Sequence, residues 1–103
     1  MIFIETSRFS DLRESYLDDD DFGLLQAMLI HRPDAGDIIR GSGGVRKVRW
    51  AAKGTGKRGG IRVIYYWITK KDHILFLTLY KKGEVDDLAK DETREMWKTV
   101  KSL

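Results

Sequence analysis

The sequence predicts an α+β fold, in which one small sheet and three helices form a single domain over residues 1–103. One observation is the order of elements, β-α-α-β-β-β-α, because three successive strands without intervening helices are typical of this class. The other is size and composition. The chain has the length of one domain, is 42% hydrophobic and contains one Pro, so it can form a core and is not disordered by default.

The N-terminal third reads as a strand followed by two helices. Residues 1–4 alternate, and the apolar residues of 7–17 recur at helical spacing. The four aspartates of 18–21 suit the N-cap and first turn of a second helix, which ends near Arg32 because Pro33 disfavours helical geometry before it. A metal site in this acidic run is the less favoured interpretation, since consecutive carboxylates on a helix point in different directions.

Three strands follow a turn-rich stretch at 34–44. The first, at 45–52, alternates, with Val48 and Trp50 on the face opposite Lys47, Arg49 and Ala51. The second, at 61–69, is apolar on both faces, which predicts a central place in the sheet. A short link at 70–72 makes a hairpin with the third strand.

The third strand spans 73–80, and a helix at 88–100 ends the chain. Simple alternation in this strand places Leu75, Leu77 and Leu79 on one face of the sheet. The side chains expected on the other face are those of Ile74, Phe76, Thr78 and Tyr80.

Several classes of protein are excluded by what the sequence lacks. No apolar run approaches the ~18–20 residues of a membrane span, and an acid at position 5 does not fit a signal peptide. Zero Cys excludes disulfide scaffolds, thiol nucleophiles and Cys-ligated zinc. We therefore expect a cytoplasmic protein that is not exported.

Charge is strongly segregated along the chain. Residues 1–39 hold three Lys/Arg and nine Asp/Glu, a balance of −6, whereas 40–82 hold twelve Lys/Arg and one Asp, a balance of +11. The remainder, 83–103, holds four and six, or −2, which leaves the net charge of +3. Such segregation favours a face that binds a polyanion.

The segment 51–62 is a basic, glycine-rich loop between two strands. It is not a Walker A motif, because Arg58 follows Lys57 where Ser or Thr is required, and a strand follows instead of a helix. A solvated hairpin loop is the simpler alternative. Cations on the flanking strands favour a binding patch instead, and these are Arg46, Lys47, Arg49, Arg62, Lys81 and Lys82.

Most aromatic residues of the strands are expected in the core, and Tyr80 is the expected exception. At a strand end beside two lysines, its ring can stack on a base or its hydroxyl can exchange a proton. His31 and His73 are isolated and are interpreted as surface residues.

Four segments resemble the RelE/ParE toxin superfamily, in particular its HigB-like, phage Gp49-like branch. They are GSGGVRKVRW at 41–50, KGTGKRGG at 53–60, IRVIYYW at 61–67 and LTLYKKGEVDDL at 77–88. The resemblance implies a small twisted antiparallel sheet with two N-terminal helices on one face, a C-terminal helix and a concave basic cleft. It also implies a type II toxin that acts as a ribosome-dependent endoribonuclease on mRNA in the A site, without a cofactor, and that is neutralised by a HigA-like helix-turn-helix antitoxin.

Carried over by position, the resemblance implies cleavage residues in this cleft, namely Arg49, Lys57, Arg62, Tyr80 and Lys82. The other cations are expected to bind RNA, and they are Arg46, Lys47, Lys53, Arg58 and Lys81. Metal-free RNA cleavage needs a proton acceptor, a proton donor and cations for the phosphorane transition state. Two alternatives stay open: a ParE-like gyrase inhibitor, against which the twelve cations of 40–82 count, and a non-catalytic RNA-binding or interaction module.

Overall fold

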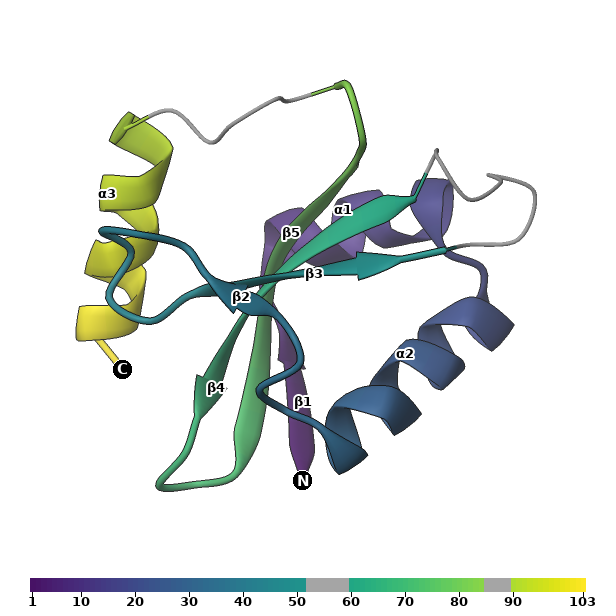
Figure 1. The fold of residues 1–103 in the computed structure, drawn as a ribbon, viewed down its shortest axis with the longest axis horizontal. Helices are drawn as coiled ribbons and strands as arrows, with labels where there is room; N and C mark the ends of the chain where they lie inside the picture. Colours follow the sequence, from purple (N-terminus) through teal and green to yellow (C-terminus); the bar gives the residue numbers. More distant parts are fainter. Residues whose placement is uncertain (52–59, 85–89) are drawn as a thin grey trace.

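The computed structural model describes residues 1–51, 60–84 and 90–103, and it confirms the predicted α+β class (Figure 1). Five strands form one sheet in the order β1-β5-β4-β3-β2. The elements are β1 (Ile2–Glu5), α1 (Ser7–Tyr16), α2 (Asp19–His31), β2 (Asp37–Ile38), β3 (Arg46–Trp50), β4 (Ile61–Ile68), β5 (His73–Lys81) and α3 (Lys90–Lys101).

The central position of β4 is confirmed, and the sheet differs from the expectation in two respects. β1 pairs in parallel with β5, so the sheet is mixed and not wholly antiparallel. Parallel pairing is possible because β1 and β5 are far apart in the chain, with two helices and three strands between them, and are not connected by a hairpin. The stretch expected to be only turns also contains β2, which pairs antiparallel with β3. None of the described helices is long and apolar enough to span a membrane.

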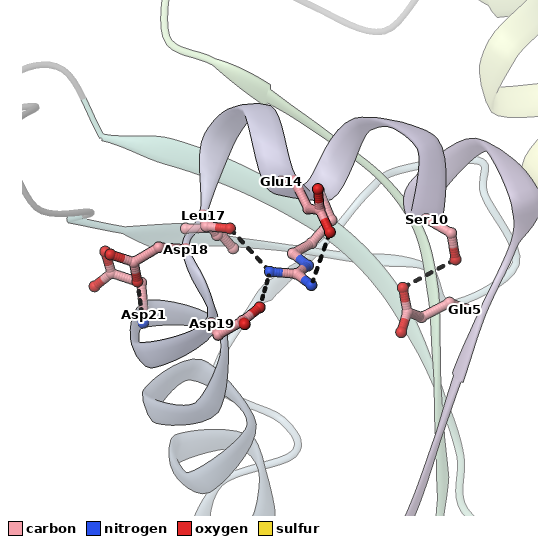
Figure 2. Close-up of polar contacts among 8 residues, drawn as sticks. Glu5, Ser10, Glu14, Leu17, Asp18, Asp19 and Asp21 are labelled. Carbon is pink, nitrogen blue, oxygen red and sulfur yellow. Dashed lines mark hydrogen bonds and ion pairs between the residues drawn. The ribbon is translucent and has the colours of Figure 1, made fainter.

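Each of the two N-terminal helices begins with a side-chain N-cap, and the cap of α2 is the one that the sequence predicts. The Asp18 carboxylate accepts the Asp21 backbone N–H at 2.7 Å, and Thr6 does the same for Phe9 at 3.2 Å. Figure 2 shows the junction between the helices, where Arg13 donates to Asp19 at 2.8 Å and to the Leu17 carbonyl at 3.2 Å. The guanidinium therefore joins α1 to α2.

These helices cover one face of the sheet. Phe9 of α1 stacks on Phe76 of β5 with 4.7 Å between ring centroids, and Phe22 of α2 meets the same ring edge-on at 5.4 Å. We call this the first core. Its buried members are Phe9, Leu17, Phe22, Leu25, Leu29, Val48, Ile61, Val63, Tyr65, Ile74, Phe76 and Leu79.

α3 packs on the other face, over a second core that is smaller than the first (Figure 1). Met96 is its buried helical residue, and Trp97 lies against Gly43 in the connection between β2 and β3. The buried members of the second core are Val45, Ile64, Leu75, Leu77, Tyr80 and Met96. The expected helix start at 88 lies outside the described residues.

A β-bulge in β5 changes which side chains share a face. Ile64 pairs with Thr78 and Tyr65 pairs with Phe76, so Leu77 is an extra residue in β5. Beyond this point the two faces exchange, with Leu79 in the first core and Tyr80 in the second. The expectation that Tyr80 shares a face with Phe76 is therefore wrong.

Candidate nucleic-acid interface

Three of the expected site residues form a row across three strands. Arg49 of β3 is paired with Arg62 of β4, and Arg62 is paired with Tyr80 of β5. Directly paired residues project from the same face, with Cα atoms about 5 Å apart. We call these residues the cross-strand row, and they lie on the face where α3 packs.

Two lysines extend the row. Lys47 lies two residues before Arg49 in β3, on the same face by strand alternation. Lys82 follows the end of β5, is exposed, and donates its backbone N–H to the Gly60 carbonyl at 3.2 Å. The structure therefore places four of the ten expected site residues on one face of the sheet, with Lys82 next to them in the chain after β5.

The two arginines of the row are directly paired across β3 and β4, with no acid beside them among the residues that the structure describes. Arg62 Nη1 donates to the Gly60 carbonyl at 3.2 Å, and Arg49 is exposed. Among the described residues, no carboxylate lies within 4.0 Å of either guanidinium. Like charges directly opposite in a sheet are unfavourable. A bound phosphate would relieve this repulsion, because each guanidinium can grip two of its oxygens.

Tyr80 differs from the expectation in its burial. It is 7% exposed and belongs to the second core, so the expectation that it lies outside the core is wrong. The reason is that both faces of β5 are covered, and the bulge turns Tyr80 toward the face that α3 covers. A buried ring does not stack on a base in this conformation, which leaves its hydroxyl as the group suited to proton exchange.

Two of the expected RNA-binding cations lie on the opposite face. Arg46 donates to the carbonyls of Gly36 at 2.8 Å and Asp34 at 3.3 Å, so it stabilises the connection after α2. Lys81 is paired with Ile61, a residue of the first core, and so projects from the face that α1 and α2 cover. The remaining three, Lys53, Lys57 and Arg58, lie outside the described residues.

Tyr65 is a buried polar residue that the sequence did not single out. Its hydroxyl donates to the Pro33 carbonyl at 2.7 Å and accepts the Gly36 N–H at 3.0 Å. Burial raises the pKa of Tyr65 above its usual value, although the Gly36 hydrogen bond and the charge of Arg46 oppose that change. The role of this phenol is structural, because it ties β4 to the segment between α2 and β2.

Glu84 is a second residue that sequence reasoning missed, and it lies in the turn after β5, four residues beyond Tyr80. Its carboxylate accepts from the Tyr16 hydroxyl at 3.1 Å and from the Lys81 N–H at 2.7 Å. Burial, together with the hydrogen bond and negative charge of Glu84, raises the pKa of Tyr16. The only signal in the sequence is that Glu84 begins a short acidic run after a pair of lysines, which predicts no contact with α1.

One comparison with known proteins bears on this site. Residues 10–103 match the model of a protein family described as the RelE toxin of the RelE / RelB toxin-antitoxin system. The match includes the whole cross-strand row, all of α2 and α3, and α1 from Ser10 onward. It confirms the superfamily that the four segments resemble.

Proposed function

The chain belongs to the RelE toxin family, and from this premise we propose that it is a ribosome-dependent endoribonuclease of the HigB-like branch. Its substrate is mRNA held in the ribosomal A site, and its catalytic centre is the cross-strand row with Lys82. The observation that supports this most strongly is the pair of facing arginines, Arg49 and Arg62, which no described carboxylate neutralises.

The reaction is an in-line attack of a ribose 2′-oxygen on the adjacent phosphorus. The bond from phosphorus to the 5′-oxygen breaks, a base takes the 2′-hydroxyl proton, and an acid protonates the leaving 5′-oxygen. Arg49 and Arg62 stabilise the charge that grows on the non-bridging oxygens. The Tyr80 hydroxyl exchanges a proton with one of the reacting oxygens, and Lys47 and Lys82 hold the flanking backbone.

Cell-free translation tests this function directly. The protein is added to a translating extract and to the same mRNA without ribosomes, and the RNA ends are mapped by primer extension. We expect cuts within the reading frame only when ribosomes are present, and none with Arg62→Ala. Intact mRNA with inhibited DNA supercoiling would instead indicate a gyrase inhibitor, and RNA binding without cuts would indicate a non-catalytic module.

We also propose that a HigA-like helix-turn-helix antitoxin is the partner, because the family is a toxin of a toxin-antitoxin pair. Expression of the chain alone in the bacterial cytoplasm should arrest growth, and co-expression of an antitoxin encoded beside it should relieve the arrest. Normal growth with abundant folded protein would contradict the toxic activity.

A further inference from the structure

We propose that Glu84 and Tyr16 are positioning residues that hold the Arg62 guanidinium in place through the turn after β5. This inference rests on the proposed function, since it assigns a role in the same reaction. Both oxygens of Glu84 are used: Oε1 accepts the Lys81 backbone N–H at 2.7 Å, and Oε2 accepts the Tyr16 hydroxyl at 3.1 Å. The carboxylate therefore anchors the end of β5 to the last residue of α1.

The same turn is also fastened to β4. Glu84 N–H donates to the Lys81 carbonyl at 3.1 Å, which closes the turn, and Gly83 takes the φ of +93° that the turn requires. Next to Lys81, the Lys82 N–H donates to the Gly60 carbonyl at 3.2 Å. The turn is thus held between α1 on one side and the start of β4 on the other.

The Gly60 carbonyl connects this turn to the candidate catalytic centre. It accepts both the Lys82 N–H and Arg62 Nη1, each at 3.2 Å. Gly60 is buried, and a Cβ there would lie 3.3 Å from Arg62 Nη1 and 3.3 Å from the Trp50 carbonyl. A shift of the turn moves this carbonyl, and the guanidinium that it holds moves with it.

A positioning role for Glu84 can be distinguished from a role in RNA binding, because the Glu84 carboxylate is negatively charged. A carboxylate in a turn beside Lys82 repels phosphate, so its removal should tighten RNA binding. Its hydrogen bonds, in contrast, favour catalysis by fixing the site geometry. A substitution that removes both the charge and the hydrogen bonds of Glu84 should therefore raise RNA affinity and lower the cleavage rate, which a loss of stability alone does not produce.

The test compares Glu84→Ala, Glu84→Gln and Tyr16→Phe with a control, Glu14→Ala, which removes the same charge from an exposed residue of α1. Single-turnover cleavage on programmed ribosomes and affinity for a short RNA are measured for each folded variant. We expect Glu84→Ala to cleave about 10- to 100-fold more slowly, the range typical of misplaced catalytic groups, while binding RNA more tightly. Glu14→Ala should cleave at the parent rate.

Glu84→Gln keeps the contacts without the charge, because its amide oxygen can accept from Lys81 and its NH₂ can donate to the Tyr16 hydroxyl. It should bind RNA as tightly as Glu84→Ala and cleave within about threefold of the parent. Tyr16→Phe removes one hydrogen bond and should slow cleavage about 2- to 10-fold.

Three outcomes would overturn the positioning role. They are parent-rate cleavage by Glu84→Ala, equal loss in the Gln and Ala variants, and parent-rate cleavage by Tyr16→Phe. The Tyr16→Phe result decides the matter even if Glu84→Ala does not fold. Intact mRNA after incubation of the parent protein with programmed ribosomes would instead contradict the proposed function itself, so the two failures are distinguishable.

Discussion

Arg62 and Arg46 show how differently two arginines of neighbouring strands are held. Arg46 donates to two carbonyls, those of Gly36 and Asp34, on the face that α1 and α2 cover. Among the described residues, Arg62 donates only to the Gly60 carbonyl next to its own strand and is paired with Arg49. The contacts of Arg46 stabilise the connection after α2. Those of Arg62 leave most of its five donors available for a ligand.

Arg62→Ala is expected to separate activity from stability. The free energy of unfolding should change by no more than about 0.5–1 kcal/mol, because the side chain gives up a single hydrogen bond and a repulsive neighbour. Loss of a transition-state phosphate contact should lower the cleavage rate about 100- to 1,000-fold. Thermal unfolding and mRNA cleavage by the same preparation check this. An unfolded variant, or a folded variant of full activity, would show that Arg62 is not catalytic.

Arg46→Ala should give the opposite result. It leaves two backbone carbonyls without their charged donor, so we expect the free energy of unfolding to fall by about 1–3 kcal/mol. The cleavage rate of the folded fraction should stay close to that of the parent, since Arg46 lies on the other face of the sheet from the row. A large loss of cleavage rate without a loss of stability would indicate that Arg46 binds RNA after all.

Tyr65→Phe is expected to alter the pH dependence of stability. Burial holds the pKa of Tyr65 above its unfolded value, so the stabilisation is complete below about pH 10 and decreases as the pH rises toward the folded pKa. The variant should lose about 1–3 kcal/mol at neutral pH, because Gly36 N–H and the Pro33 carbonyl lose their partner. Denaturant unfolding at about pH 7 and pH 10.5 should show the two proteins converging at the higher pH.

The residues of the candidate site were only partly predictable from sequence. Alternation correctly groups Lys47 with Arg49, and the same period places Arg46 with Val48 and Trp50, so its orientation is also readable. Arg46 was expected to bind RNA only because it lies in the basic segment 40–82. The contact between Glu84 and Tyr16 was not predictable, because it joins residues 68 positions apart through a turn with no distinctive motif.

At the scale of elements, one extra residue decides the composition of the site. The order of helices and strands, the central position of β4 and the hairpin at 70–72 all follow from hydrophobic periodicity. The bulge at Leu77 does not, because β5 is apolar on both faces and either phase of alternation buries hydrophobic residues. Tyr80 reaches the face of Arg62 only through this bulge. The parallel pairing of β1 with β5 and the two-residue strand β2 have equally little local signal in the sequence.

The docking of α3 gives a prediction at this scale. Gly43 has a φ of +79°, and a Cβ there would lie 2.6 Å from Trp97 Cδ1. Gly43→Ala should loosen α3 through both this clash and the left-handed backbone, which alone costs about 1–2 kcal/mol. Gly83→Ala is the matched control, because Gly83 has a φ of +93° with no neighbour within 4 Å. Hydrogen exchange of the α3 amides should accelerate in the first variant and not in the control.

On the scale of the whole molecule, the charge pattern of the sequence becomes a pattern in space. The acidic residues 1–39 build the two helices that cover one face, and the basic residues 40–82 supply the cross-strand row on the other. We therefore expect the proposed RNA substrate to be attracted to the face of the row and repelled from the helices, and so to be oriented before any specific contact forms.

The salt dependence of RNA binding tests that arrangement. Each phosphate contact releases counterions, so the logarithm of the association constant should fall linearly with the logarithm of salt concentration. Replacing Lys57 and Arg58 by Ala should reduce the slope by about one for each contact removed. The control replaces Lys70 and Lys71, which carry the same charge but follow β4 at the end opposite Arg62, roughly 20 Å along the strand. Equal changes in both double variants would mean that RNA responds only to net charge, and an unchanged slope for Lys57 and Arg58 would exclude the glycine-rich segment from the binding face.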